Sequence, residues 1–197
     1  MDKAVIIFVK NPVKGRVKTR LAASIGDEEA LQVYLGLLDH TRDALQHVDA
    51  DFHLYYSSFI DFEDEWDNKQ FKKSLQFPGD LGQRMFHAFE EVLEHSGQAV
   101  IIGSDCPEIN SDIINEALSA LESSDYVIGP SHDGGYYLLG MKKAESSIFE
   151  DINWSTDTVF DATLRSIENL NASVQIMKTL YDLDNADDLE RFPEFKV

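Results

Sequence analysis

The residues best suited to chemistry are a group of cations near the start of the chain. Residues 3–24 hold six Lys and Arg side chains and no carboxylate, although the whole chain has 17 Lys+Arg against 36 Asp+Glu. An apolar run over residues 4–9 precedes most of these cations and predicts a buried strand that runs into a turn-forming loop. In an α/β protein such a loop is a common binding place for phosphate. We therefore expect a phosphate-bearing ligand here, with a solvated basic loop as the alternative. The six cations are Lys3, Lys10, Lys14, Arg16, Lys18 and Arg20.

Asp105 is the second candidate, in the segment Gly103-Ser104-Asp105-Cys106-Pro107 that follows the most apolar predicted strand. Ligands of open parallel sheets bind beyond the carboxyl ends of the strands, so Asp105 is expected at the same sheet edge as the basic loop. A carboxylate there is suited to a divalent cation that bridges phosphates. The alternative is that Asp105 only caps the following helix.

Asp133 is the third candidate, and three roles are open for it. It lies between two predicted strands and is followed by Gly134 and Gly135, a typical hairpin signal. It could join Asp105 as a second metal ligand, act as a general base, or serve only the turn.

Other familiar chemistries are disfavoured. Cys106 is the only cysteine, which excludes an internal disulfide and a Cys-based zinc site and favours a cytoplasmic location. The neighbouring Asp105 would raise the pKa of its thiol, which argues against a nucleophile. Gly15-x-x-Lys18-Thr19 lacks the first glycine of a Walker A loop, and no GxGxxG follows the first strand.

The overall charge also limits the choice of partners. A formal net charge of −19 argues against nucleic acid and anionic lipid surfaces, but not against a small anionic substrate at the basic loop. No apolar run approaches the ~20 residues of a membrane span. A chain of 197 residues is expected to form a single domain over residues 1–197.

Strand and helix patterns alternate along the chain. This alternation predicts a three-layer α/β/α sandwich with a mostly parallel mixed sheet. Asp27 and Ser111 are expected to open two of the helices, and residues 61–73 are ambiguous, with Trp66 and Phe71 as expected anchors. The expected strands are 4–9, 51–58, 98–103, 125–129, 136–141 and 173–177, and the expected helices follow Asp27 and Ser111 and span 81–93, 158–170 and 186–191.

Several motifs, taken together, resemble a known family. The chain is similar to the DUF2064 or CofC-like transferases, of the GT-A nucleotide-diphospho-sugar transferase superfamily. The matches cover nearly the whole chain in family order. They are Phe8-x-Lys10-x-Pro12-x-x-Gly15-x-Val17-Lys18-Thr19-Arg20-Leu21, Gly79-Asp80-Leu81-Gly82-x-Arg84-Met85, Gly103-Ser104-Asp105-Cys106-Pro107, Gly129-Pro130-x-x-Asp133-Gly134-Gly135-Tyr136, Trp154-Ser155-Thr156 and Asp182-Leu183-Asp184-x-x-x-Asp188-Leu189.

The resemblance implies a GT-A-like fold and a transferase that depends on Mg²⁺ or Mn²⁺. It implies Asp105 and Asp133 as metal ligands, with these two and Lys18 as the catalytic group. One departure is that Ser104-Asp105-Cys106 supplies a single aspartate where superfamily glycosyltransferases carry DxD. The implied nucleotide- and phosphate-binding residues are Lys10, Lys14, Gly15, Arg16, Lys18, Arg20, Gly82, Arg84 and Ser104.

The function expected from the resemblance is that of a nucleotide-diphospho-sugar transferase with a nucleotide-activated donor. One alternative is a nucleotidyltransferase that joins an NTP to a phosphorylated acceptor and releases pyrophosphate. Another is a non-catalytic nucleotide-binding module. The expected partner is a small nucleotide or nucleotide-sugar, and the base, sugar, acceptor and oligomeric state stay open. Because Lys18 and Arg20 have no carboxylate nearby in the sequence, their charge reversal is expected to spare the fold.

Overall fold

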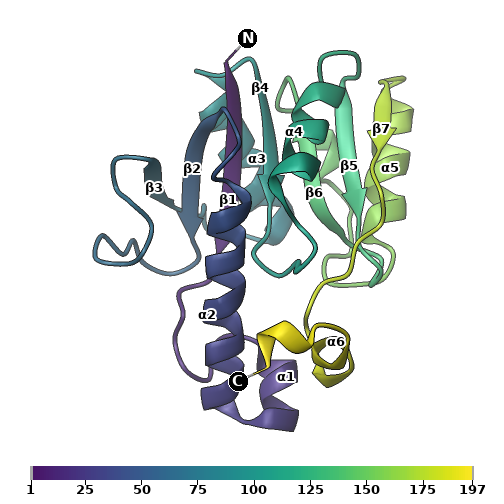
Figure 1. Ribbon diagram of the computed structural model, residues 1–197. Helices are drawn as coiled ribbons and strands as arrows, with labels where there is room; N and C mark the ends of the chain where they lie inside the picture. Colours follow the sequence, from purple (N-terminus) through teal and green to yellow (C-terminus); the bar gives the residue numbers. More distant parts are fainter. Residues whose placement is uncertain (1, 197) are drawn as a thin grey trace.

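A computed structural model describes residues 2–196, and all seven strands in this range join one sheet. The strand order is β3-β2-β1-β4-β6-β5-β7, so β1 and β4 lie near the centre (Figure 1). The strands are β1 (Lys3–Val9), β2 (Asp51–Tyr56), β3 (Phe71–Leu75), β4 (Gln98–Ile102), β5 (Tyr126–Pro130), β6 (Tyr136–Met141) and β7 (Val174–Ile176).

Strand β6 runs antiparallel to both of its neighbours, β4 and β5. Every other pair of neighbouring strands is parallel. The carboxyl ends of the remaining six strands therefore point to one edge of the sheet. The predicted mostly parallel mixed sheet is confirmed.

Helices cover both faces of the sheet, which gives the predicted three layers (Figure 1). Helices α2 (Asp27–Ala44) and α4 (Ser111–Ala120) contribute to one buried apolar cluster, and α3 (Leu81–Leu93) and α5 (Val159–Asn169) contribute to another. Side chains alternate between the two faces along a strand. Accordingly Val5 and Ile7 join the first cluster, and Ala4 and Ile6 join the second. The short helices are α1 (Thr19–Ile25), α6 (Ala186–Arg191), η1 (Ser146–Ile148) and η2 (Pro193–Phe195).

A third apolar cluster brings the two ends of the chain together. It joins Leu21 of α1 and Leu37 of α2 to Leu183 and to Leu189 of α6. In Figure 1 the purple α1 and the yellow α6 accordingly lie next to one another beyond one edge of the sheet. This packing holds the segment around Leu183 close to the basic loop.

Some element boundaries differ from the expectations. Helix α1 was not predicted, and Asp27 is the first residue of α2, with Gly26 as its N-cap. Strand β3 begins inside the ambiguous stretch and was not predicted. It is an edge strand with little apolar character, and its Lys73 is buried in an ion pair with Asp64 at 2.7 Å.

The two anchors expected in the ambiguous stretch are confirmed. Trp66 and Phe71 are buried, as expected for anchors. Within residues 2–196, no helix has the length and apolar character needed to cross a membrane.

Candidate functional site

A cavity of about 720 Å³ opens at the carboxyl ends of β1 and β4. Its walls come from the basic loop, the loops after β4 and β5, the start of α3 and the segment before α6. The predicted residues among those that line it are Lys10, Lys18, Arg20, Arg84, Ser104, Asp105 and Asp133.

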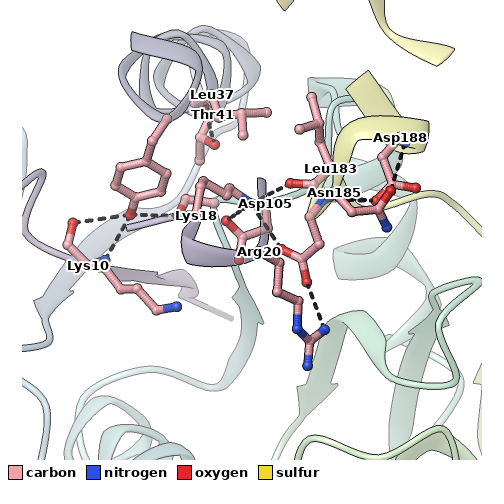
Figure 2. Close-up of polar contacts among 12 residues, drawn as sticks. Lys10, Lys18, Arg20, Leu37, Thr41, Asp105, Leu183, Asn185 and Asp188 are labelled. Carbon is pink, nitrogen blue, oxygen red and sulfur yellow. Dashed lines mark hydrogen bonds and ion pairs between the residues drawn. The ribbon is translucent and has the colours of Figure 1, made fainter. Parts of the chain in front are cut away.

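Lys18 is the most buried of the predicted cations, with its side chain 3% exposed. Its backbone has a left-handed conformation at φ 46° and precedes the first turn of α1. The ammonium Nζ lies 2.6 Å from Asp105 Oδ1 and donates to the Leu183 carbonyl at 2.6 Å and to Asp184 Oδ1 at 3.3 Å (Figure 2). Burial lowers the pKa of Lys18, but the attraction of Asp105 and Asp184 outweighs it and leaves this pKa above its ordinary value.

No carboxylate lies near Lys18 and Arg20 in the sequence, but the folded chain supplies carboxylate partners to both. Asp105 and Asp184 pair with Lys18, and Asp184 also lies 3.9 Å from Arg20. These partners are far away in the sequence and close only in the folded chain. A Glu at position 18 would place a buried carboxylate against two others, so this charge reversal would destabilise the fold.

Asp105 lines the cavity, and its side chain is 41% exposed. Its backbone carbonyl accepts from the Leu183 N–H at 2.8 Å, which ties the loop after β4 to the last segment of the chain. The alternative that Asp105 caps the next helix is wrong. Asn110 is the N-cap of α4, and its side chain accepts from the Ile113 N–H at 3.1 Å. The Asp105 carboxylate is therefore free of a capping role.

Asp133 lies in the hairpin between β5 and β6 and also lines the cavity. Its Oδ1 accepts from the Ser131 hydroxyl at 2.5 Å and from the Gly135 N–H at 2.9 Å. Both bonds fix the turn, so Asp133 has the structural role that the sequence left open. Because its carboxylate also borders the cavity, the structural role leaves the roles of metal ligand and general base open.

Three further carboxylates line the cavity, Asp157, Asp182 and Asp184, and the sequence assigned none of them to the site, although Asp182 and Asp184 belong to one of the motifs that resemble the family. By itself the acidic run 182–188 is typical of a helix cap, and Asn185 and Asp188 do form a capping box at the start of α6. Asp182 and Asp184 lie three and one residues before Asn185, and these additional carboxylates were the available signal. Burial raises the pKa of Asp182 to about 7, and repulsion from Asp105, Asp133 and Asp184 adds to the effect.

Tyr34 of α2 is a further missed residue, which links two loops of the site. Its hydroxyl accepts from the Lys10 N–H at 2.9 Å and lies 3.1 Å from both the Lys10 carbonyl and the Ser104 Oγ. The loops after β1 and β4 are thereby held together beneath the cavity.

Four of the predicted binding residues lie outside the cavity lining. Lys14 pairs with Glu28 at 2.7 Å on the surface, Arg16 is exposed, and Gly15 makes a turn at φ +74°. Gly82 is a packing position, because a Cβ there would lie 2.6 Å from the Trp154 ring, which itself lines the cavity. The basic loop therefore directs only part of its charge to the site.

Cys106 is 4% exposed, and burial raises the pKa of its thiol to about 12, with Asp182 adding to the shift. Such a thiol carries almost no thiolate near neutral pH, which agrees with the view that it is not a nucleophile.

The cavity thus brings cations and carboxylates together at one sheet edge. Within residues 2–196 no three His, Cys, Asp or Glu side chains cluster as a ready metal centre. Such a mixed-charge site suits an anionic ligand that arrives with a cation of its own.

The chain is similar to several proteins of known name. Over 144 residues it is 27% identical to a 2-phospho-L-lactate guanylyltransferase of Methanocaldococcus jannaschii, and the match covers 73% of this chain and 62% of that protein. The chain thus spans about three fifths of the length of that relative.

Two solved structures share the fold. A crystal structure of a candidate nucleotide-diphospho-sugar transferase from Desulfovibrio desulfuricans G20 has a TM-score of 0.88 at 29% identity, over 98% of this chain and 87% of that one. The inositol-1-phosphate CTP transferase from T. maritima has a TM-score of 0.64 at 15% identity, over 98% and 94%. The expected nucleotide-diphospho-sugar transferase fold is confirmed.

Residues 38–156, more than half of the chain, match the family described as "Uncharacterized protein conserved in bacteria (DUF2064)". The motifs that suggested this family include the loops that form the cavity. The chain belongs to the DUF2064 family.

Proposed function

We propose that the protein is a transferase that binds a nucleotide-activated substrate in the cavity at the carboxyl ends of β1 and β4. The observation that carries this proposal is the meeting of opposite charges there: Lys10, Lys18, Arg20 and Arg84 border the same cavity as Asp105 and Asp133. Cations can bind the phosphates of a nucleotide, and the carboxylates can hold a divalent cation between them.

Nucleotidyl transfer is the reaction that we favour. The guanylyltransferase relative supports it, and so does the single aspartate after β4. In this reaction an acceptor oxygen forms a bond to the α-phosphorus of an NTP, the bond from that phosphorus to the bridging oxygen breaks, and pyrophosphate leaves. Glycosyl transfer from a nucleotide-diphospho-sugar, with release of an NDP, is the second candidate. The similarity to the D. desulfuricans structure favours it.

The carboxylates of the site fit a divalent cation such as Mg²⁺ or Mn²⁺. Burial is the main cause of the raised pKa of Asp182, but repulsion from Asp105, Asp133 and Asp184 contributes to it, and a cation would neutralise this negative charge. Mg²⁺ is usually held by one or two carboxylates, with the other ligands supplied by phosphates and water. Asp105 and Asp133 would hold it, and the cation would neutralise charge that develops on the phosphates during transfer.

The chain's own cations would complete the phosphate site. Arg20 is exposed beside the cavity, and Arg84 is held by the Gly79 carbonyl at 2.9 Å and by Gln76 Oε1 at 3.3 Å. Lys10 is exposed at the end of β1, with its backbone fixed by Tyr34. Of these three cations, Arg84 is the one whose side chain is held in place by hydrogen bonds, and a preorganised cation of this kind would stabilise a leaving diphosphate without further rearrangement.

The experiment that tests this proposal is product identification. NTPs and NDP-sugars are first screened by thermal shift with and without Mn²⁺, because a ligand at 100 times its Kd stabilises a protein by about 2.7 kcal/mol. The stabilising ligand is then incubated with candidate acceptors and followed by ³¹P NMR. Nucleotidyl transfer, which we expect, releases pyrophosphate. Glycosyl transfer would instead release a free NDP. Binding without turnover of any acceptor would favour the non-catalytic module.

A further inference from the structure

Lys18 has all three of its ammonium donors engaged by the protein itself. The partners are Asp105 Oδ1 at 2.6 Å, the Leu183 carbonyl at 2.6 Å and Asp184 Oδ1 at 3.3 Å (Figure 2). An ammonium group has three donors and no acceptor. In this arrangement Lys18 therefore offers no donor to a phosphate, in contrast to what its place in the basic loop suggests.

The partner of Lys18 is also the carboxylate that the proposed function gives to a divalent cation. Among residues 2–196, Lys18 is the one Lys, Arg or His that forms an ion pair with Asp105. A hard-cation ligand lies ~2.0–2.6 Å from its metal, so a bound cation and the ammonium would lie only a few ångströms apart. Like charges at that distance repel strongly in a partly buried site.

We propose, resting on the proposed function, that Lys18 is a positioning residue that holds Asp105 in place of the divalent cation and competes with it. A metal ion alone must overcome the charge of Lys18 and therefore binds weakly. A phosphate-bearing ligand brings negative charge and offers the ammonium a new partner, so that metal and ligand bind cooperatively. The coupling is reciprocal, since each ligand raises the affinity of the other by the same factor.

The same loop supplies a matched control. Arg20 is two residues further along, its side chain is 76% exposed, and it approaches Asp184 at 3.9 Å rather than pairing with Asp105. Its removal takes the same charge out of the loop without releasing Asp105. Lys18→Met therefore removes the ion pair with Asp105, whereas Arg20→Met leaves that ion pair intact.

The test is the affinity for Mn²⁺ alone, measured by calorimetry without any nucleotide. We expect Lys18→Met to bind Mn²⁺ roughly tenfold more tightly than the parent, a typical size for coupling between two ligands. The affinity of Arg20→Met for Mn²⁺ should stay within about twofold of that of the parent. Unchanged or weaker Mn²⁺ binding by a Lys18→Met protein with a native near-UV circular dichroism spectrum would overturn the proposal. A merely structural role of Lys18 predicts that weaker binding.

A measurement on the parent protein tests the same claim if Lys18→Met does not fold. In ¹⁵N-lysine NMR, the ammonium signal of Lys18 must shift as Mg²⁺ saturates the site. A signal that stays in place at saturation contradicts the competition. A parent that binds neither Mn²⁺ nor any nucleotide would refute the proposed function as well, whereas failure of the Lys18 result alone leaves that function standing.

Discussion

Asp182 is a carboxylate whose ionised form the fold disfavours. Its pKa is raised to about 7, so the folded chain holds a proton that the unfolded chain gives up near the ordinary value of 3.8. Because the folded state binds more protons in this window, the contribution of Asp182 to stability falls as the pH rises from about 4 to 7. The full cost is present above pH 7.

Asp182→Asn should therefore stabilise the metal-free protein in a pH-dependent way. We expect a gain on the order of 3 kcal/mol above pH 7 and almost none near pH 4, where Asp182 of the folded chain still holds its proton and is neutral like Asn. Urea unfolding of parent and variant in EDTA across this range measures the difference. If the free energies of unfolding of parent and variant differed by the same amount at every pH, the pKa of Asp182 would not be raised in the folded chain.

At this scale the sequence predicted Asp105 and Lys18 for one cavity, because both follow apolar strands whose carboxyl ends share an edge. It did not predict that they pair with each other. It gave Asp182 and Asp184 no role in the cavity, since their approach to Lys18 and Asp105 depends on the cluster around Leu21 and Leu183. No local pattern predicts a contact between residues so far apart in the sequence.

Among the secondary-structure elements, the hairpin between β5 and β6 depends on one glycine. Gly134 has φ +88°, and a Cβ there would lie 2.1 Å from the Asp157 carbonyl oxygen. Its own carbonyl accepts from the Phe160 N–H at 2.9 Å, which ties the hairpin to the start of α5. The turn and the loop before α5 therefore fit together only without a side chain.

Gly134→Ala should lower the free energy of unfolding by about 2–4 kcal/mol, because it combines a strained φ with a clash against backbone. Gly103→Ala is the matched control, since a Cβ at Gly103 meets nothing within 4 Å. It should cost under about 1 kcal/mol, as is typical where no such mechanism acts. Equilibrium unfolding in urea compares the two. Similar losses in both variants would mean that the contact with Asp157 does not constrain the hairpin.

The elements that the sequence predicted best have strong local signals. The bounds of β6 and α6 agree with the expected 136–141 and 186–191, the first being an apolar run after glycines and the second a helix with an Asn–Asp capping box. Strand β3, with the sequence FKKSL, was missed because two of its five residues are lysines, and helix α1, with the sequence TRLAASI, was missed because it is short and follows Lys18 of the basic loop. Tertiary ion pairs, which a pattern of hydrophobicity does not register, hold Lys73 and Lys18.

For the molecule as a whole, the site depends on residues from both ends of the chain. The cavity lining runs from Phe8 to Asp184, and the third apolar cluster holds α1 against the segment before α6. Although the chain has a net charge of −19, four Lys and Arg side chains line this cavity beside its aspartates. A small anion that carries a divalent cation suits both features.

The central claim is that a nucleotide binds in this cavity together with a divalent cation held by Asp105. Calorimetric titration of the best nucleotide from the thermal-shift screen, in Mn²⁺ and in EDTA, tests it on the parent protein and on Asp105→Asn. We expect Mn²⁺ to tighten binding to the parent at least tenfold, by about 1.4 kcal/mol, and to have little effect on Asp105→Asn. The substitution keeps the size of the side chain and removes the charge that a hard cation requires. A metal effect of equal size in the parent and in Asp105→Asn, or the absence of binding by every NTP and NDP-sugar, would contradict the account.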